Sequence, residues 1–306
     1  MSKAACSFLR VILFLTAFTY SSLSVSADEN TLSLIILGSG GPGYNASRAE
    51  ASVLIRYGDI EILVDMGNGT LAGLSEAGTR PNQLEALFIT HHHLDHTQEF
   101  MPILAGALLG RKAPVIVGPE GINALADCTQ SFYKDDITYR RANMGVTGAI
   151  PVPEVREVSG GEQFYIYDIS VTCAGVNHTI ETIAYRFDAA GRSIVVSGDL
   201  YYSENLISLA QGADILVLDS GSLAGAGQGK PNPRQTSSTD PARASTQGQS
   251  HSTLEELIAM LIDTDVKFVV LTHLPNKPIN EEAVKAAFAA AGIDSVILFA
   301  TDGMEL

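Results

Sequence analysis

Residues 90–96 read THHHLDH, which places four imidazoles and one carboxylate in a single short stretch. Neutral imidazole and carboxylate are the ligands that zinc and neighbouring transition metals prefer. The apolar run before it, residues 84–89, predicts a buried strand that carries the stretch to a strand end. A solvated polar turn or an adventitious histidine tract is the alternative. Because the stretch lies mid-chain between apolar segments, we interpret it as a metal-binding loop.

The order of residues within this loop indicates ligands for two ions. His91 and His93 alternate with His92, so on an extended segment the outer two share a face and His92 points away. Asp95 and His96 follow where the chain is expected to turn into a helix, and they can point at a second metal. One short loop could therefore supply two adjacent ions.

The other three histidines of the chain also stand at the ends of predicted elements. His178 and His273 each follow a predicted strand, and His251 stands where a helix is expected to begin. A lone histidine such as His178 is usually structural. Asp199, preceded by a glycine at the end of an apolar run, is well placed to bridge two ions. A two-metal centre needs about three ligands per ion plus a bridge, and these residues supply them.

Two further stretches lie at predicted strand ends. Asp65 ends the apolar run at residues 60–64, so it could hydrogen-bond a ligand imidazole from behind; helix N-capping is the alternative. Residues 38–43 read GSGGPG. A phosphate-binding loop is weakly indicated, because no Gly-Lys-Ser/Thr follows and Pro42 lacks a backbone donor. A tight turn at the edge of the site is favoured.

The rest of the chain alternates predicted strands and helices. This alternation is compatible with two sheets flanked by helices or with a doubly wound sheet. Residues 120–131 are expected to form a helix, and residues 132–153, with mixed charge, an irregular insertion. A content of 46% hydrophobic and 17% charged residues in 306 is that of an ordinary globular protein with a substantial core.

The N-terminus is typical of a secretory signal peptide. Lys3 and Arg10 precede an apolar core at residues 11–20, and small residues follow before residue 28. The core is short for a membrane span, although an uncleaved anchor is the alternative. We therefore expect residues 1–27 to be removed, residues 28–306 to form the mature protein in the periplasm or outside the cell, and no membrane association after cleavage.

Two cysteines remain after the signal, Cys128 and Cys173. In an oxidising compartment they could form a disulfide. Two buried unpaired thiols are at least an equal alternative, because the sequence does not determine the distance between them.

The chain is acidic, with a net charge of −15 that becomes more negative once the signal is removed. Such a surface repels nucleic acid unless a local basic patch counteracts it, and no segment is dense in Lys or Arg. We therefore expect no nucleic-acid partner.

Residues 221–250 consist mostly of Gly, Ser, Thr, Pro and Gln, which predicts a long flexible loop inside the domain. The loop contains Lys230, Arg234 and Arg243, with Asp240 as its one acidic residue. In an acidic protein these cations are candidates for binding an anionic substrate. A simple linker is the alternative.

Together these motifs resemble the signature of the metallo-β-lactamase superfamily, His-x-His-x-Asp-His followed by a single His, a bridging Asp and a final His. Within it, residues 38–42 and 251–253 resemble the branch that contains ribonuclease Z and the zinc-dependent arylsulfatases. With leucine at position 94, the histidine-rich loop also resembles that of the class II cyclic-nucleotide phosphodiesterases. The chain lacks the long basic arm with which ribonuclease Z holds transfer RNA. The resemblance implies an α/β fold, a four-layer αβ/βα sandwich of two mixed β-sheets flanked by helices.

The resemblance also implies the metal ligands. The first metal would be bound by His91, His93 and His178; the second by Asp95, His96 and His273, with Asp199 as the bridge. Two zinc ions are expected, with manganese or iron as alternatives. Asp65 matches the strand end that supports a ligand, and His92 is left over as a non-ligand.

The function expected from these residues is that of an exported binuclear-zinc hydrolase. It would cleave small anionic esters, of the arylsulfatase or phosphodiesterase type, by attack of a metal-bound hydroxide. Asp95 and His251 are the expected catalytic residues, with His251 as a neutral imidazole that donates a hydrogen bond to the reacting oxygen. The alternatives are an enzyme like ribonuclease Z or a cyclic-nucleotide phosphodiesterase, and a non-catalytic metal-binding protein on the same fold. A homodimer is compatible with the sequence.

Overall fold

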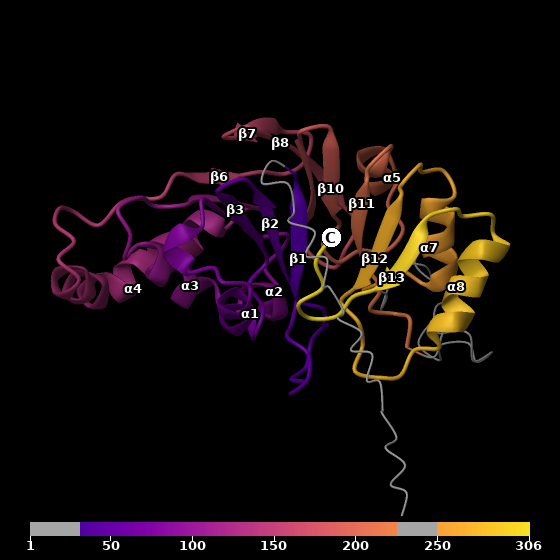
Figure 1. The fold of residues 1–306 in the computed structure, drawn as a ribbon, viewed down its shortest axis with the longest axis horizontal. Helices are drawn as coiled ribbons and strands as arrows, with labels where there is room; N and C mark the ends of the chain where they lie inside the picture. Colours follow the sequence, from indigo (N-terminus) through magenta and orange to yellow (C-terminus); the bar gives the residue numbers. More distant parts are fainter. Residues whose placement is uncertain (1–30, 225–249) are drawn as a thin grey trace, which may run out of the picture.

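The computed structural model describes residues 31–224 and 250–306, which form two β-sheets packed face to face with helices on both outer sides (Figure 1). This is the expected αβ/βα sandwich. The expected signal peptide and the three cations of the 221–250 loop, Lys230, Arg234 and Arg243, lie outside the described residues.

The first sheet has the strand order β1-β2-β3-β4-β5-β6. Its first three strands are antiparallel and the remaining pairs are parallel. The strands are β1 Ser33–Gly38, β2 Ser52–Tyr57, β3 Ile60–Val64, β4 Ala86–Phe88, β5 Val115–Gly118 and β6 Val155–Glu157.

The second sheet has the order β13-β12-β11-β10-β9-β8-β7. Strands β7 to β10 are antiparallel, whereas β10 to β13 run parallel. The strands are β7 Gln163–Ile166, β8 Ile169–Val176, β9 Thr182–Ala189, β10 Arg192–Val196, β11 Ile215–Asp219, β12 Phe268–Thr272 and β13 Val296–Phe299.

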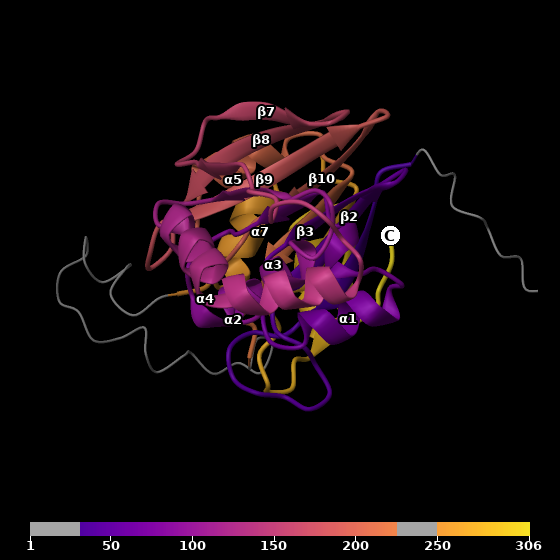
Figure 2. The same ribbon diagram turned by 90° about the vertical axis from the view of Figure 1, so that its left-hand side faces the viewer.

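The helices lie on the two outer faces, and Figure 2 views the molecule from the side of α3 and α4. The first sheet is covered by α1 Thr70–Glu76, α2 Leu94–Thr97, α3 Phe100–Ala107 and α4 Ile122–Asn143, with the short helix η1 Pro81–Gln83 between them. The second sheet is covered by α5 Glu204–Ala210, α7 Leu254–Leu261 and α8 Glu281–Ala290. In the described ranges no helix is both long and apolar enough to cross a bilayer.

The strands are apolar on both faces because each sheet is buried on both sides. In β1, Leu34 and Ile36 join the core between the sheets. Their neighbours Ile35 and Leu37 pack instead against the helices of the first layer. The second sheet likewise packs its outer face on α5, α7 and α8. This double burial explains why the sequence shows continuous apolar runs where a half-exposed strand would alternate.

The expectation of an irregular insertion at residues 132–153 is wrong in its first half. Helix α4 does not end near residue 131 but runs to Asn143. Its last turn is anchored by Arg141, a buried side chain that donates hydrogen bonds to the carbonyl oxygens of Leu108 and Ala149. The polar composition of this segment reflects a helix that projects from the domain and is exposed on most of its surface.

Neither cysteine is in a disulfide. Cys128 is exposed on α4, whereas Cys173 is buried in β8 within the core between the sheets. Burial raises the pKa of the Cys173 thiol to about 12. The structure therefore contains unpaired thiols, but the expectation that both are buried is wrong for Cys128, which lies on the exposed surface of α4.

The topology brings several polar strand ends to one edge of the sandwich. Because β10, β11 and β12 are parallel, the residues after them, Asp199 and His273 among them, emerge on the same side. Strands β3 and β4 of the facing sheet are parallel too, and they end next to Asp65 and the His91 loop. The buried hydroxyl of Tyr185 on β9 donates a hydrogen bond of 2.7 Å to the carbonyl oxygen of Ile89, which ties the two sheets together just behind this edge.

Candidate metal centre

Three imidazoles converge at this edge to form the first ligand group. The Nε2 atom of His91 lies 3.0 Å from the Nδ1 atom of His93, which lies 3.2 Å from the Nε2 atom of His178. His91 and His93 come from the loop after β4, and His178 comes from the turn between β8 and β9. Residues separated by more than a quarter of the chain thus point three ring nitrogens at one place.

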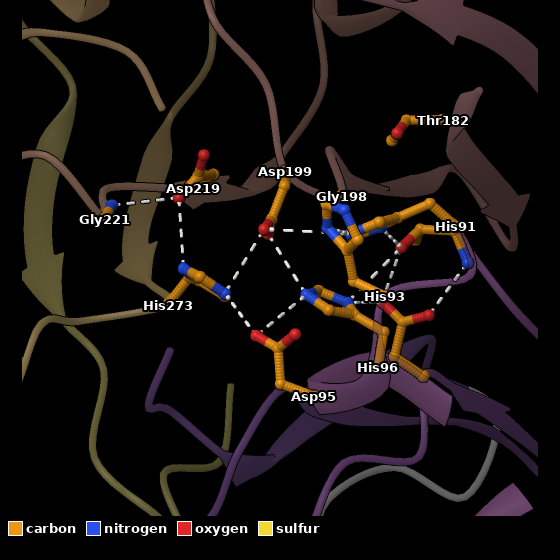
Figure 3. A network of polar contacts seen from close by, with 12 residues as sticks. His91, His93, Asp95, His96, Thr182, Gly198, Asp199, Asp219, Gly221 and His273 are labelled. Carbon is orange, nitrogen blue, oxygen red and sulfur yellow. Dashed lines mark hydrogen bonds and ion pairs between the residues drawn. The ribbon is translucent and has the colours of Figure 1, made fainter. Parts of the chain in front are cut away.

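A second group lies beside the first and consists of Asp95, His96 and His273. The Nε2 atom of His273 lies 3.0 Å from the Oδ2 atom of Asp95, and the Nε2 atom of His96 lies 3.7 Å from the same oxygen. All three side chains are nearly or fully buried. Figure 3 shows the carboxylate of Asp95 pointing between the two rings.

The carboxylate of Asp199 lies between the two groups (Figure 3). Its Oδ1 atom is 3.2 Å from His96 Nε2, and its Oδ2 atom is 3.3 Å from His273 Nε2. The Oδ2 atom also lies 3.8 Å from His91 Nε2 and 3.9 Å from His178 Nε2. Asp199 therefore belongs to both ligand sets, each of which has all its candidate ligand atoms within 4.8 Å of one another.

The spacing of these atoms fits tetrahedral metal ions. Ligand atoms about 2.0–2.1 Å from a tetrahedral zinc ion lie about 3.4 Å from one another, close to the distances within each group. The chemistry of the first group also fits, because burial and the neighbouring His96 lower the pKa of His91 far below its usual value. Burial likewise lowers the pKa of His178 to about 4. Neutral imidazoles whose ring nitrogens converge in this way are suited to bind a metal cation.

His96 and Asp199 stabilise each other's charged forms. Burial alone would lower the pKa of His96, but Asp199 and Asp65 outweigh burial and hold the pKa well above its usual value. Burial alone would raise the pKa of Asp199, but His273 and His96 hold it well below its usual value. A carboxylate that stays ionised at full burial is suited to binding a cation.

Asp65 supports the ligands from behind. Its carboxylate accepts hydrogen bonds of 2.8 Å from the backbone N–H of Thr90, from the Thr90 hydroxyl and from Nδ1 of His96. The Thr90 hydroxyl in turn lies 3.0 Å from Nδ1 of His91. Both Nδ1 atoms are thereby assigned protons, so the Nε2 atoms present their lone pairs to the metal positions. Asp65 does not cap a helix, since α1 begins at Thr70 with Gly69 as its N-cap.

His92 stands apart from the ligand groups. Its Nε2–H donates to the carbonyl oxygen of Glu120 at 3.1 Å, on the side of the loop away from the other histidines. The alternation in the sequence predicted this orientation.

His251 lies at the open side of the two groups. Its ring centroid is 4.8 Å from that of His273 and 5.9 Å from that of His178. Helix α7 begins at Leu254, and its N-cap is Thr253, which forms a capping box with Glu256. His251 is therefore in the loop before the helix and is not its cap.

Sequence reasoning missed Asp219, the last residue of β11. Its Oδ2 atom accepts a 2.9 Å hydrogen bond from Nδ1 of His251. Burial lowers the pKa of His251, but Asp219 and then Asp199 outweigh it and raise the pKa to about 9. These two carboxylates favour a protonated His251, whereas the sequence predicted a neutral imidazole. The signal was present, because Asp219 ends an apolar run as Asp65 and Asp199 do.

Two glycines allow the rings to pack this closely. A Cβ atom at Gly41, in the GSGGPG stretch, would lie 2.8 Å from Cε1 of His273. A Cβ atom at Gly221 would lie 2.7 Å from Cγ of His251. The stretch after β1 is thus a turn at the edge of the site, as its sequence indicated.

Three comparisons place this geometry among known proteins. Residues 61–274 match the family model described as the β-lactamase superfamily domain. Ribonuclease Z of Mycobacterium sp. (strain KMS) is 31% identical over 283 residues, which are 89% of this chain and 94% of that protein. The metallo-β-lactamase fold protein YhfI from Bacillus subtilis has a TM-score of 0.67 at 16% identity, covering 90% of this chain and 99% of that one. The short form of human tRNase Z has a TM-score of 0.61 at 19% identity, covering 90% and 98%.

These relatives overturn one expectation. We expected a small ester substrate and no nucleic-acid partner, whereas a relative that aligns with most of this chain is named for action on RNA. The expectation was wrong because it used the net charge of the whole chain, which does not describe the field at a metal centre.

The two ligand groups predict a metal content of about two zinc ions per chain. Elemental analysis of protein purified without chelators, before and after zinc reconstitution, measures it. A content near zero after reconstitution would contradict the two-metal interpretation.

Substitutions of the neighbouring residues His92 and His93 should affect zinc content differently. His93→Ala removes a nitrogen that lies 3.0 Å from His91 Nε2, so bound zinc should fall. His92→Ala removes only a hydrogen bond to a backbone carbonyl, so zinc content should be unchanged. If His92→Ala also loses zinc, the assignment of the converging imidazoles is wrong.

Proposed function

Because the chain belongs to the β-lactamase superfamily and aligns along most of its length with a ribonuclease Z, we propose that it is a metal-dependent phosphodiesterase that cleaves RNA. The observation that carries the proposal is the pair of ligand groups that share Asp199. His251, oriented by Asp219, lies beside them. The relatives favour this alternative over the arylsulfatase interpretation. Export, which rests on residues 1–27, is a separate prediction.

The chemistry follows from what surrounds the scissile phosphate. Two bound divalent ions would lower the pKa of a water and neutralise charge on the phosphate oxygens. The ions would be held by His91, His93 and His178 on one side and by Asp95, His96 and His273 on the other, with Asp199 shared. The buried Asp65 and Thr90 hold two of these imidazoles in the ligating tautomer.

His251 is suited to deliver a proton to the leaving oxygen. Asp219 holds Nδ1 of His251 at 2.9 Å and so fixes the plane of the ring next to the metal groups. A departing sugar oxygen needs a proton or a cation as its bond to phosphorus breaks, and a positioned imidazole supplies one. Asp219 is in turn held by the backbone N–H groups of Leu200 and Gly221.

A non-catalytic role for the same fold is disfavoured by the completeness of the site. The candidate ligand atoms of each predicted group all lie within 4.8 Å of one another. The candidate proton donor His251 is hydrogen-bonded to the carboxylate of Asp219 beside them. A protein that only stored metal would need no His251 at this position.

Substrate class is tested directly with zinc-loaded protein. A transfer-RNA precursor should be cleaved, a chelator should stop cleavage and zinc should restore it. Asp199→Ala, which removes the shared ligand, is the matched inactive control. Bis-nitrophenyl phosphate and nitrophenyl sulfate are measured in parallel. If the sulfate ester is hydrolysed while RNA stays intact, the proposal is wrong.

For the proton donor, His251→Ala should lower kcat by roughly 10²–10⁴-fold, the usual effect of losing a positioned acid or base, with zinc content retained. His92→Ala, a histidine outside the ligand groups, is the control and should keep its activity. Near-normal kcat in His251→Ala would remove His251 from the mechanism. Since Thr253 is the helix cap, lost capping is not an alternative explanation of a lowered kcat.

A further inference from the structure

A small cavity lies between the two sheets directly beneath the metal centre. It is walled by the apolar side chains of Val53, Val64, Val196 and Val217, all at the inner faces of strands. Its polar side is formed by residues of the site: Ser52, Asp65, His96, Asp199, Asp219 and His273. The volume open to a water-sized sphere is about 20 Å³. A single water needs about 10–15 Å³ by this measure, so the cavity has room for one.

Unpartnered polar atoms line this cavity. Across residues 31–224 and 250–306, the buried side-chain atoms that lack a hydrogen-bond partner are Ser52 Oγ, His96 Nε2, His178 Nδ1 and His273 Nδ1. His96 Nε2 faces the second metal position. Ser52 and His273, each 2% exposed, are the other two that belong to the cavity. A buried hydroxyl or imidazole without a partner costs free energy, which indicates a bound molecule that satisfies both.

The distance between His273 and Asp219 indicates that the bound molecule is a water. The Nε2 atom of His273 belongs to the second ligand group, so when it binds a metal ion its Nδ1 atom bears the proton. The Oδ1 atom of Asp219 is 3.6 Å from this Nδ1, which is too long for a direct hydrogen bond. Figure 3 marks this contact between His273 and Asp219 with a dashed line. Polar groups at such a distance are commonly bridged by water.

We propose that the cavity binds one structural water that links Ser52 Oγ, His273 Nδ1 and Asp219, and that Ser52 is a positioning residue for the second metal. The water accepts a hydrogen bond from Nδ1–H of His273 and donates to Asp219 and to Ser52. Three hydrogen bonds are typical of a buried water. The inference rests on the metal centre of the proposed function.

The two imidazoles of the second group show why this water matters. His96 is held by a direct 2.8 Å hydrogen bond to Asp65. His273 has no such direct contact, and its backbone is in the left-handed region, with a φ of 54°. Its ring is enclosed by Gly41 and the ring of His251, which restrict it without assigning its tautomer. The water accepts a hydrogen bond from Nδ1–H of His273, as the carboxylate of Asp65 accepts one from Nδ1–H of His96.

The test measures zinc affinity and needs no RNA. Ser52→Val fills the cavity and excludes the water, whereas Ser52→Ala removes one of its three partners. Loss of such outer contacts typically weakens metal binding 10–100-fold. We expect that loss in one of the two zinc-binding steps for Ser52→Val, and a smaller loss for Ser52→Ala. Metal-free protein is titrated with zinc against a competing chelator, and the melting temperature of the metal-free form checks folding.

Ser193→Ala is the matched control, because Ser193 is similarly buried in β10 but its hydroxyl contacts Asp214 at the other end of the strand. It should bind zinc with unchanged affinity. A crystal structure of the zinc-loaded protein should show one ordered oxygen within hydrogen-bond distance of Ser52 Oγ and His273 Nδ1.

Two results would overturn the inference: no such oxygen in well-ordered density, or unchanged zinc affinity in a folded Ser52 variant. Should Ser52→Val not fold, the affinity of Ser52→Ala and the crystal structure decide. Failure of RNA cleavage with normal zinc binding would contradict the proposed function and leave this inference intact.

Discussion

The carboxylate of Asp199 is the constraint on which the rest of the site depends. It lies within 4 Å of five imidazoles, which come from the β4 loop, the β8–β9 turn, the end of β12 and the loop before α7. Taking a carboxylate out of water is costly unless cations or donors surround it. Asp199 is almost fully buried and remains ionised because His273 and His96 face it. Those imidazoles can face it only if both sheets end at the same edge, and this requirement explains the parallel strands β10 to β12.

The scaffold meets this requirement with local strain. Asp65 and His273 both have positive φ angles, 60° and 54°, although neither is glycine. Such conformations cost about 1–3 kcal/mol each and persist where the surroundings over-determine them. For Asp65 the surroundings are three hydrogen bonds to Thr90 and His96. For His273 they are the packing of Gly41 and His251 on its ring. Strain at these two positions is thus part of how the strand ends turn their side chains toward Asp199.

Local patterns predicted what is local in the structure. The alternation around His92, the apolar runs before Asp65 and Asp199, and the glycines before β2 all depend on a few neighbouring residues, and the structure places them as expected. The extent of α4 could not be read this way, because its last turn is held by contacts of Arg141 with segments more than 30 residues away. Asp219 ends an apolar run and so carried a local signal, but its role depends on His251, which is 32 residues later in the chain. The ligand groups were predicted through resemblance to a family, because spacing alone does not specify distances between separate loops.

Charge is where sequence reasoning failed, and the failure has a physical cause. A net charge of −15 describes the whole surface, but charges on that surface are screened within about 8 Å at physiological salt. The phosphate of a substrate would instead meet the local field of the site. In the proposed function two divalent ions would bring four positive charges, against the two carboxylates Asp95 and Asp199 of the ligand set. Of the outer carboxylates, Asp219 is matched by His251, whose pKa it raises, and Asp65 leaves one negative charge beside the neutral ligand His96. The metal-loaded site would therefore be cationic inside an acidic protein, and it would attract a phosphodiester that the remaining surface repels.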